Sequence, residues 1–183
     1  MKFYYKCPEC GLKLDIKPDV TLCPVCRESQ KPNRPLTGVL ETRSEGSVNT
    51  SPFDNASDFV YKMLPVEKEF FPPIPVGMTP LWEPKNLRSE MSLPGLYLKD
   101  DTLNPTGSLK DRASFLVAAF ARKYGISDVV VASTGNAASS MSGVGAAAGL
   151  NIKIFIPSSA PKAKMVQALQ YGADVNLVDG TYD

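Results

Sequence analysis

The fold is decided by residues 127–157, which read SDVVVASTGNAASSMSGVGAAAGLNIKIFIP. The mostly apolar run at 127–133 predicts a buried strand, and 151–157 predicts a second one. Between them, 137–148 is rich in small residues and is followed by Gly149, which is typical of a helix that ends in a glycine cap. A strand, a helix and a strand in this order predict a β-α-β unit with parallel strands.

The same alternation continues on both sides of this unit. Downstream, 158–172 begins with serines that can cap a helix and ends in a glycine, so it predicts a helix, and 174–179 predicts a third strand. Upstream, 111–124 predicts a helix and 94–101 a short strand. Two consecutive β-α-β units predict an α/β fold with a parallel sheet.

This layout gives a physical meaning to the loop ASTGNAASS, residues 132–140. It lies where a strand ends and a helix begins, at the carboxyl edge where open parallel sheets bind ligands. A helix start offers unpaired N–H groups and a positive dipole end, which favour a phosphate or a carboxylate. A capped turn of the kind that many helices carry is the alternative for this stretch taken alone.

A second candidate site lies in NPTGSLKDRAS, residues 104–114. Asn104, Pro105 and Gly107 are turn formers, and helix-favouring residues follow, so Lys110 is predicted at a junction between loop and helix. A lone lysine at a helix start is most often simply solvated. Asp111 and Arg112 are expected to form a local ion pair at the same helix start.

Composition narrows the possible functions. The chain has 183 residues, 43% of them hydrophobic, a formal charge of +1 and no histidine. The absence of a basic excess argues against nucleic acid as a partner, and no stretch has the length of a signal peptide or a membrane span, so a cytoplasmic chain with no membrane partner is expected. Without histidine, acid–base chemistry near neutral pH falls to Lys, Asp, Glu, Tyr or a cofactor.

The cysteines form two C-x-x-C pairs near the N-terminus, CPEC and CPVC, separated by twelve residues. Two such pairs can supply four thiolates to one tetrahedral zinc, which predicts a structural zinc site at Cys7, Cys10, Cys23 and Cys26. Two disulfides and a redox dithiol are the alternatives. We therefore divide the chain into a zinc-ribbon-like module at 1–30, a connecting arm at 31–75 rich in Pro, Ser, Asn and Gly, and an α/β domain at 76–183.

Three motifs, in this order and at this separation, resemble a known family. They are VGMTPL at 76–81, LYLKDDTLNPTGSLKDRAS at 96–114 and ASTGNAASS at 132–140. The set is similar to the amino-terminal half of the fold-type-II pyridoxal-phosphate enzymes, and within them to the threonine synthases. The resemblance implies an incomplete fold-type-II domain with a parallel Rossmann-like sheet after the ribbon, and pyridoxal 5'-phosphate as the cofactor beside structural zinc.

The resemblance also implies roles for single residues. Lys110 stands where the family joins a lysine amine covalently to the cofactor aldehyde, and it would then carry protons during the reaction. Asn136 matches the asparagine that bonds the 3'-oxygen of the cofactor ring. The residues that match the loop holding the substrate carboxylate are Ser133, Thr134, Gly135 and Ala137, and Thr79 lies in the turn beside the site.

The implied reaction is a lyase reaction of threonine biosynthesis, in which O-phosphohomoserine and water give threonine and phosphate. Two positions depart from the family pattern: Leu109 replaces a phenylalanine, and Ala137 replaces a threonine found in many threonine synthases. The alternatives are therefore another fold-type-II lyase or synthase acting on a hydroxy or substituted amino acid, and a non-catalytic zinc-ribbon adaptor.

The family's glycine-rich loop for the cofactor phosphate would lie beyond Asp183. We expect a fragment that binds the cofactor weakly alone, and a homo-oligomer of the full-length protein that binds a small amino-acid substrate.

Overall fold

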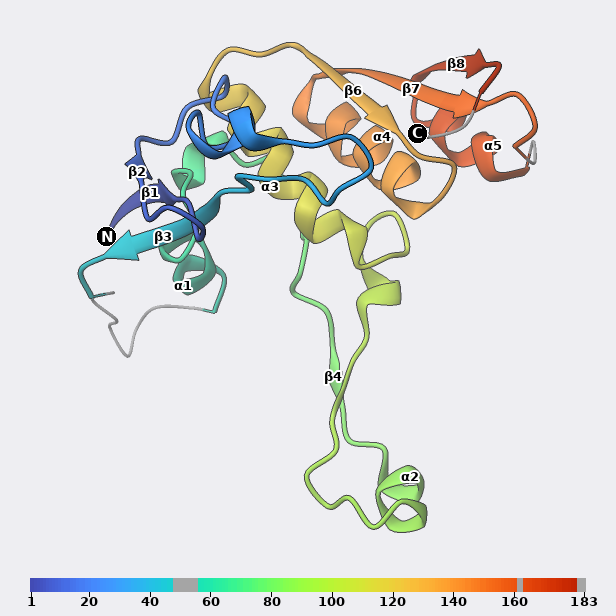
Figure 1. Ribbon diagram of the computed structural model, residues 1–183. Coiled ribbons are helices and arrows are strands. Elements are labelled where there is room, and N and C mark those ends of the chain that lie inside the picture. The colour runs from blue at the N-terminus through green and yellow to red at the C-terminus, as the bar shows by residue number, and fades with distance from the viewer. Residues whose placement is uncertain (48–55, 161–162, 181–183) are drawn as a thin grey trace. The chain divides into compact units, whose positions relative to one another are not determined.

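A computed structural model describes residues 1–47, 56–160 and 163–180 (Figure 1). The chain divides into two compact units, Met1–Glu67 and Lys68–Asp183. Within the described residues, no helix combines the length and the apolar character that crossing a membrane requires.

The first unit is built on a small antiparallel sheet with the order β2-β1-β3. Its strands are β1 (Lys2–Lys6), β2 (Lys13–Leu14) and β3 (Glu41–Glu45), and the 3₁₀ helix Cys26–Ser29 and helix α1 (Ala56–Lys62) complete the unit. Strand β3 lies in the segment that the sequence predicts as a connecting arm. Its sequence ETRSE has no apolar residue to mark a strand, and it pairs with β1 over its whole length.

Apolar burial in the first unit is slight. Among its described residues, the buried hydrophobic side chains are those of Cys7, Cys23 and Val66. Apolar burial of this extent offsets little of the conformational entropy that is lost when the described part of the module becomes ordered.

The second unit contains the predicted parallel sheet, with the order β6-β7-β8. Its main elements are α3 (Lys110–Lys123), β6 (Asp128–Ala132), α4 (Asn136–Ala148), β7 (Asn151–Pro157), α5 (Ala163–Gln170) and β8 (Asp174–Val178). Both β-α-β units predicted from the sequence are confirmed. Gly149 ends α4 with φ 72°, the left-handed conformation expected of a glycine cap.

The core of this unit lies between the sheet and its helices. Side chains of β7 alternate, with Ile152, Ile154 and Ile156 buried and the residues between them exposed. Helices α4 and α5 lie on one side of the sheet in Figure 1. The small residues of α4 permit close packing: a Cβ built on Gly145 would lie 2.4 Å from Cδ1 of Ile152.

The segment before α3 differs from the prediction. The strand expected at 94–101 is reduced to β5 (Leu98–Lys99), which pairs antiparallel with β4 (Leu81–Trp82) in a separate two-stranded sheet. Between them lies the short helix α2 (Lys85–Glu90), and 3₁₀ helices cover Lys68–Phe70 and Asp101–Leu103. Strands β4 and β5 pair over two residues only, Leu81 with Lys99 and Trp82 with Leu98.

Candidate functional site

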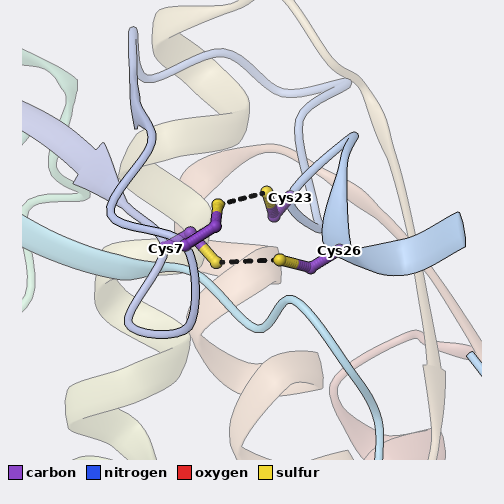
Figure 2. A group of neighbouring side chains, drawn as sticks. Cys7, Cys23 and Cys26 are labelled. Carbon is purple, nitrogen blue, oxygen red and sulfur yellow. Dashed lines mark hydrogen bonds between the residues drawn. The ribbon is translucent and has the colours of Figure 1, made fainter. Parts of the chain in front are cut away.

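The cysteine pairs lie on two turns that the backbone holds in place. In the first turn, the N–H of Gly11 donates to the carbonyl of Cys7 at 2.9 Å, and Gly11 has φ 77°. In the second, the N–H of Arg27 donates to the carbonyl of Cys23 at 3.1 Å. These turns bring the thiols of both pairs together, as Figure 2 shows, and their sulfur atoms all lie within 4.8 Å of one another.

The distances between the sulfur atoms distinguish the possible uses of the cluster. The Sγ atoms of Cys7 and Cys26 are 3.7 Å apart, and those of Cys10 and Cys23 are 3.6 Å apart. A zinc ion bound by four thiolates at about 2.3 Å has sulfur–sulfur edges of about 3.8 Å, whereas a disulfide is about 2.05 Å long. The cysteines are free, these two distances are close to the edges of such a tetrahedron, and the four sulfur atoms lie near enough together to hold one metal ion.

The four thiols differ in their environment. The backbone N–H of Cys26 lowers the pKa of Cys23 to about 7, whereas burial raises the pKa of Cys26. Zinc binds the thiolate form, which this hydrogen bond favours at Cys23. Gly38 packs directly on the cluster, because a Cβ there would lie 3.1 Å from Cβ of Cys23 and 3.3 Å from Cβ of Cys26.

Lys110 is the first residue of α3, and its side chain is exposed. Its backbone N–H donates to Oγ of Ser108 at 3.2 Å. The preceding loop turns at Gly107, which has φ 81° and donates its N–H to the carbonyl of Asn104 at 2.8 Å. The predicted junction between loop and helix is confirmed, and it presents the lysine amine to its surroundings from an ordered backbone.

Thr79 belongs to a polar cluster that ties its turn to the segment before α3. Its hydroxyl donates to Oδ1 of Asp101 at 2.8 Å, and the side chain is buried. Arg112 holds the same carboxylate through Nε and Nη2, each at 2.7 Å, and its Nη2 also donates to the carbonyl of Gly77 at 3.2 Å. The hydrogen bonds from Arg112 hold the pKa of Asp101 well below its usual range. Because the Thr79 hydroxyl donates its proton to Asp101, it can meet a ligand only as an acceptor.

The local ion pair expected between Asp111 and Arg112 is wrong. Arg112 pairs with Asp101 instead, whereas Asp111 points into the core and accepts hydrogen bonds from the backbone N–H and the hydroxyl of Thr106. Neighbouring helix residues point about 100° apart, so a shared helix start does not place their side chains together. Asp101 was not singled out from the sequence as part of this cluster, nor was Asn104, whose Oδ1 accepts the N–H of Gly77 at 2.9 Å; the only sequence signal for them is the run of acids and turn formers before Lys110.

The start of α4 contains the second group of predicted site residues. Asn136 is its first residue and is exposed, and Oγ of Ser133 accepts the N–H of Gly135 at 3.3 Å. No side-chain cap occupies the first turn, and no atom lies within 4 Å of a Cβ built on Gly135. N–H groups at the positive end of a helix suit a carboxylate or phosphate. Thr134 and Ala137, also predicted, are half-buried in the same stretch.

Helices α3 and α4 pack against each other. Oγ of Ser140 donates to Oγ of Ser114 at 2.7 Å, and both side chains are buried. Ser114 comes four residues after Lys110, and Ser140 comes four residues after Asn136. Along its own helix axis, each predicted site residue is therefore about 6 Å from this contact. The contact joins the two helices about one turn after each of these starts, where Lys110 and Asn136 are both exposed.

Comparison with known proteins adds independent information. Residues 74–183 match the family model described as pyridoxal-phosphate dependent enzyme. The chain is 30% identical to threonine synthase from Methanosarcina acetivorans, over 99% of this chain and 44% of that protein. It is 37% identical to threonine synthase from Methanocaldococcus jannaschii over 58% of this chain and 27% of that protein.

A solved structure is similar to part of this chain. The processed form of threonine deaminase isoform 2 from Solanum lycopersicum matches with a TM-score of 0.52 and 25% identity, covering 57% of this chain and 29% of that chain. The chain thus spans less than half the length of each relative named here.

Proposed function

Because the chain belongs to the family of pyridoxal-phosphate-dependent enzymes, we propose that the protein acts as a threonine synthase, converting O-phosphohomoserine and water to threonine and phosphate. The observation that carries this proposal is the similarity to the Methanosarcina threonine synthase, which runs through 99% of the chain and thus includes the cysteine module. The exposed amine of Lys110 at the start of α3 supports it, since this position matches the family's cofactor lysine.

Lys110 is the central residue of the proposed site. Its amine would join the cofactor aldehyde, and once released by the substrate it would take and return protons at the substrate carbons. No histidine is present in the sequence to share this work. When bound, the cofactor supplies a ring that stabilises negative charge at the substrate α-carbon.

The start of α4 would hold the other ligand groups. Asn136 would bond the 3'-oxygen of the cofactor ring, and the stretch from Ser133 to Ala137, with Thr134 and Gly135, would bind the substrate carboxylate through N–H groups and hydroxyls. Thr79 would act only as an acceptor, since its own proton is donated to Asp101. These roles leave the substrate held between the two helix starts.

We also propose that Cys7, Cys10, Cys23 and Cys26 bind one structural zinc ion. Support comes from sulfur–sulfur distances of 3.6 and 3.7 Å, which match the edges of a zinc–thiolate tetrahedron. Four protein ligands leave no position for substrate or water, so this zinc would stabilise the module and take no part in the reaction.

An assay of phosphate release from O-phosphohomoserine by the full-length protein tests the function. We expect release with the unaltered protein and its loss in Lys110→Ala, because this amine is the one proposed to join the cofactor. Lys123→Ala, at the far end of the same helix, is the matched control and should retain activity. An active Lys110→Ala variant would contradict the proposal.

A second candidate is a lyase that removes ammonia from a hydroxy amino acid. The similarity to threonine deaminase isoform 2 favours it, as does Ala137, which lacks the hydroxyl found in many threonine synthases. Ammonia and keto-acid formation from threonine, without phosphate release from O-phosphohomoserine, would select this function.

The expected homo-oligomer stays a prediction, and light scattering of the full-length protein tests it. The expected cytoplasmic location also stays a prediction, and fractionation of the source cells tests it.

A further inference from the structure

The loop that leads to Lys110 is held by a buried carboxylate. Asp111 has 0% exposure, and its Oδ2 accepts the backbone N–H of Thr106 at 2.7 Å while its Oδ1 accepts the hydroxyl of the same residue. A buried carboxylate is costly unless donors surround it, and Thr106 supplies two of them. The first turn of α3 adds its positive end.

Thr106 also connects this loop to the rest of the unit. Its carbonyl accepts a hydrogen bond from Nε2 of Gln167 in α5 at 3.1 Å. Its methyl group packs against α4, because a Cβ built on Gly143 would lie 2.6 Å from Cγ2 of Thr106. The backbone N–H, hydroxyl, carbonyl and methyl of Thr106 are therefore all engaged, and they meet three different helices.

The orientation of Lys110 depends on this arrangement. Asp111 follows Lys110 directly, and neighbouring helix residues point about 100° apart. With the Asp111 side chain fixed toward the core, beside the buried Ser114 and Phe115, the Lys110 side chain leaves the helix on the exposed side that also carries Ala113. A change at Thr106 or Asp111 would let the first turn rotate or fray without touching the lysine itself.

We propose that Asp111 and Thr106 are positioning residues that hold the Lys110 amine in the orientation needed for attack on an aldehyde. This inference rests on the proposed function of Lys110. It assigns to the buried pair a role beyond stability, since a reacting group displaced by about 1 Å can lose about a hundredfold in rate.

The test measures how fast the full-length protein becomes labelled on Lys110 by pyridoxal phosphate, with borohydride reduction at set times and peptide mass spectrometry. We expect Thr106→Val, which removes one donor, and Asp111→Asn, which removes the charge, to slow labelling about tenfold or more. Thr106→Ser keeps the hydroxyl and the N–H, so its Lys110 should be labelled at about the rate of the unaltered protein. Gln167→Ala removes one hydrogen bond from α5 to the carbonyl of Thr106, so it should slow labelling less than Thr106→Val. If Asp111→Asn does not fold, the labelling rates of Thr106→Val and Gln167→Ala test the proposal.

Ser142→Ala is the matched control, because it removes a buried hydrogen bond to the carbonyl of Ala138 within α4 and leaves the loop and α3 unaltered. Its labelling rate should equal that of the unaltered protein. If Ser142→Ala slows labelling as much as Thr106→Val, or if both Thr106→Val and Asp111→Asn label at the normal rate, the pair has only a structural role and the inference is wrong. An unaltered protein that is not labelled on Lys110 refutes the proposed function itself, and the positioning role with it.

Discussion

Removal of zinc should unfold the first unit while leaving the second folded. The described residues of the first unit bury the side chains of Cys7, Cys23 and Val66 as their hydrophobic core. Full burial of a side chain the size of valine contributes about 1.5–3 kcal/mol, whereas ordering each backbone residue costs about 1–2 kcal/mol. Structural zinc in small modules contributes about 10–16 kcal/mol at neutral pH. The metal should thus supply most of the free energy that holds this module together.

The assay combines metal analysis with amide NMR spectra of the purified chain. We expect one zinc per chain, its loss in Cys10→Ser or on addition of a strong chelator, and then collapse of the first unit's amide signals to random-coil positions. Signals from the sheet β6-β7-β8 should persist, since its core of isoleucines involves no metal. Glu9→Gln is the control, because it lies between the first two cysteines and keeps an acceptor for the N–H of Gly38.

Two results would refute this reasoning. One is a dispersed, unchanged spectrum of the first unit after zinc has been removed, which would mean that its few buried side chains suffice. The other is a pair of disulfides detected by mass spectrometry in the unreduced protein, because the sulfur–sulfur distances of 3.6 and 3.7 Å would then not describe the native state.

Three further predictions concern the second unit. Ser140→Ala should lower the free energy of unfolding by about 1–3 kcal/mol, because it leaves the buried hydroxyl of Ser114 without its donor; denaturant titration measures this, and a double Ser114→Ala, Ser140→Ala variant that loses the sum of both single effects would contradict it. Gly149→Ala should cost about 1 kcal/mol, because φ is 72° at this helix end; an unchanged melting temperature would count against the assigned cap. Because Arg112 lowers the pKa of Asp101 in the folded chain, this carboxylate should stabilise the fold above its unfolded pKa of about 3.9 and lose that contribution as the pH falls through the lower folded value. Arg112→Gln should therefore reduce the loss of stability below about pH 4. If the free energy of unfolding, measured by denaturant titration, falls with pH by the same amount in Arg112→Gln as in the unaltered protein, the effect is excluded.

The sequence alone determined the elements whose signals are local. Predicted strands at 127–133, 151–157 and 174–179 agree with β6, β7 and β8 to within a residue or so at each end, because runs of apolar residues flanked by polar residues and glycines mark them directly. The same holds for the position of Lys110 at the start of α3, where turn formers give way to helix formers. The C-x-x-C spacing likewise predicted that the thiols would meet.

Only the tertiary structure decided features that depend on distant partners. Strand β3 has no apolar pattern and exists because β1 pairs with it, so that Lys6 faces Glu41 and Lys2 faces Glu45 across the sheet. The direction of the Asp111 side chain could not be predicted either. The sequence places it beside Arg112, but its hydrogen-bond donor is Thr106, whose own position is set by α4 and α5. Local propensity specifies where a helix begins, whereas burial specifies which of its charges face the core, and burial is a property of the whole packed unit.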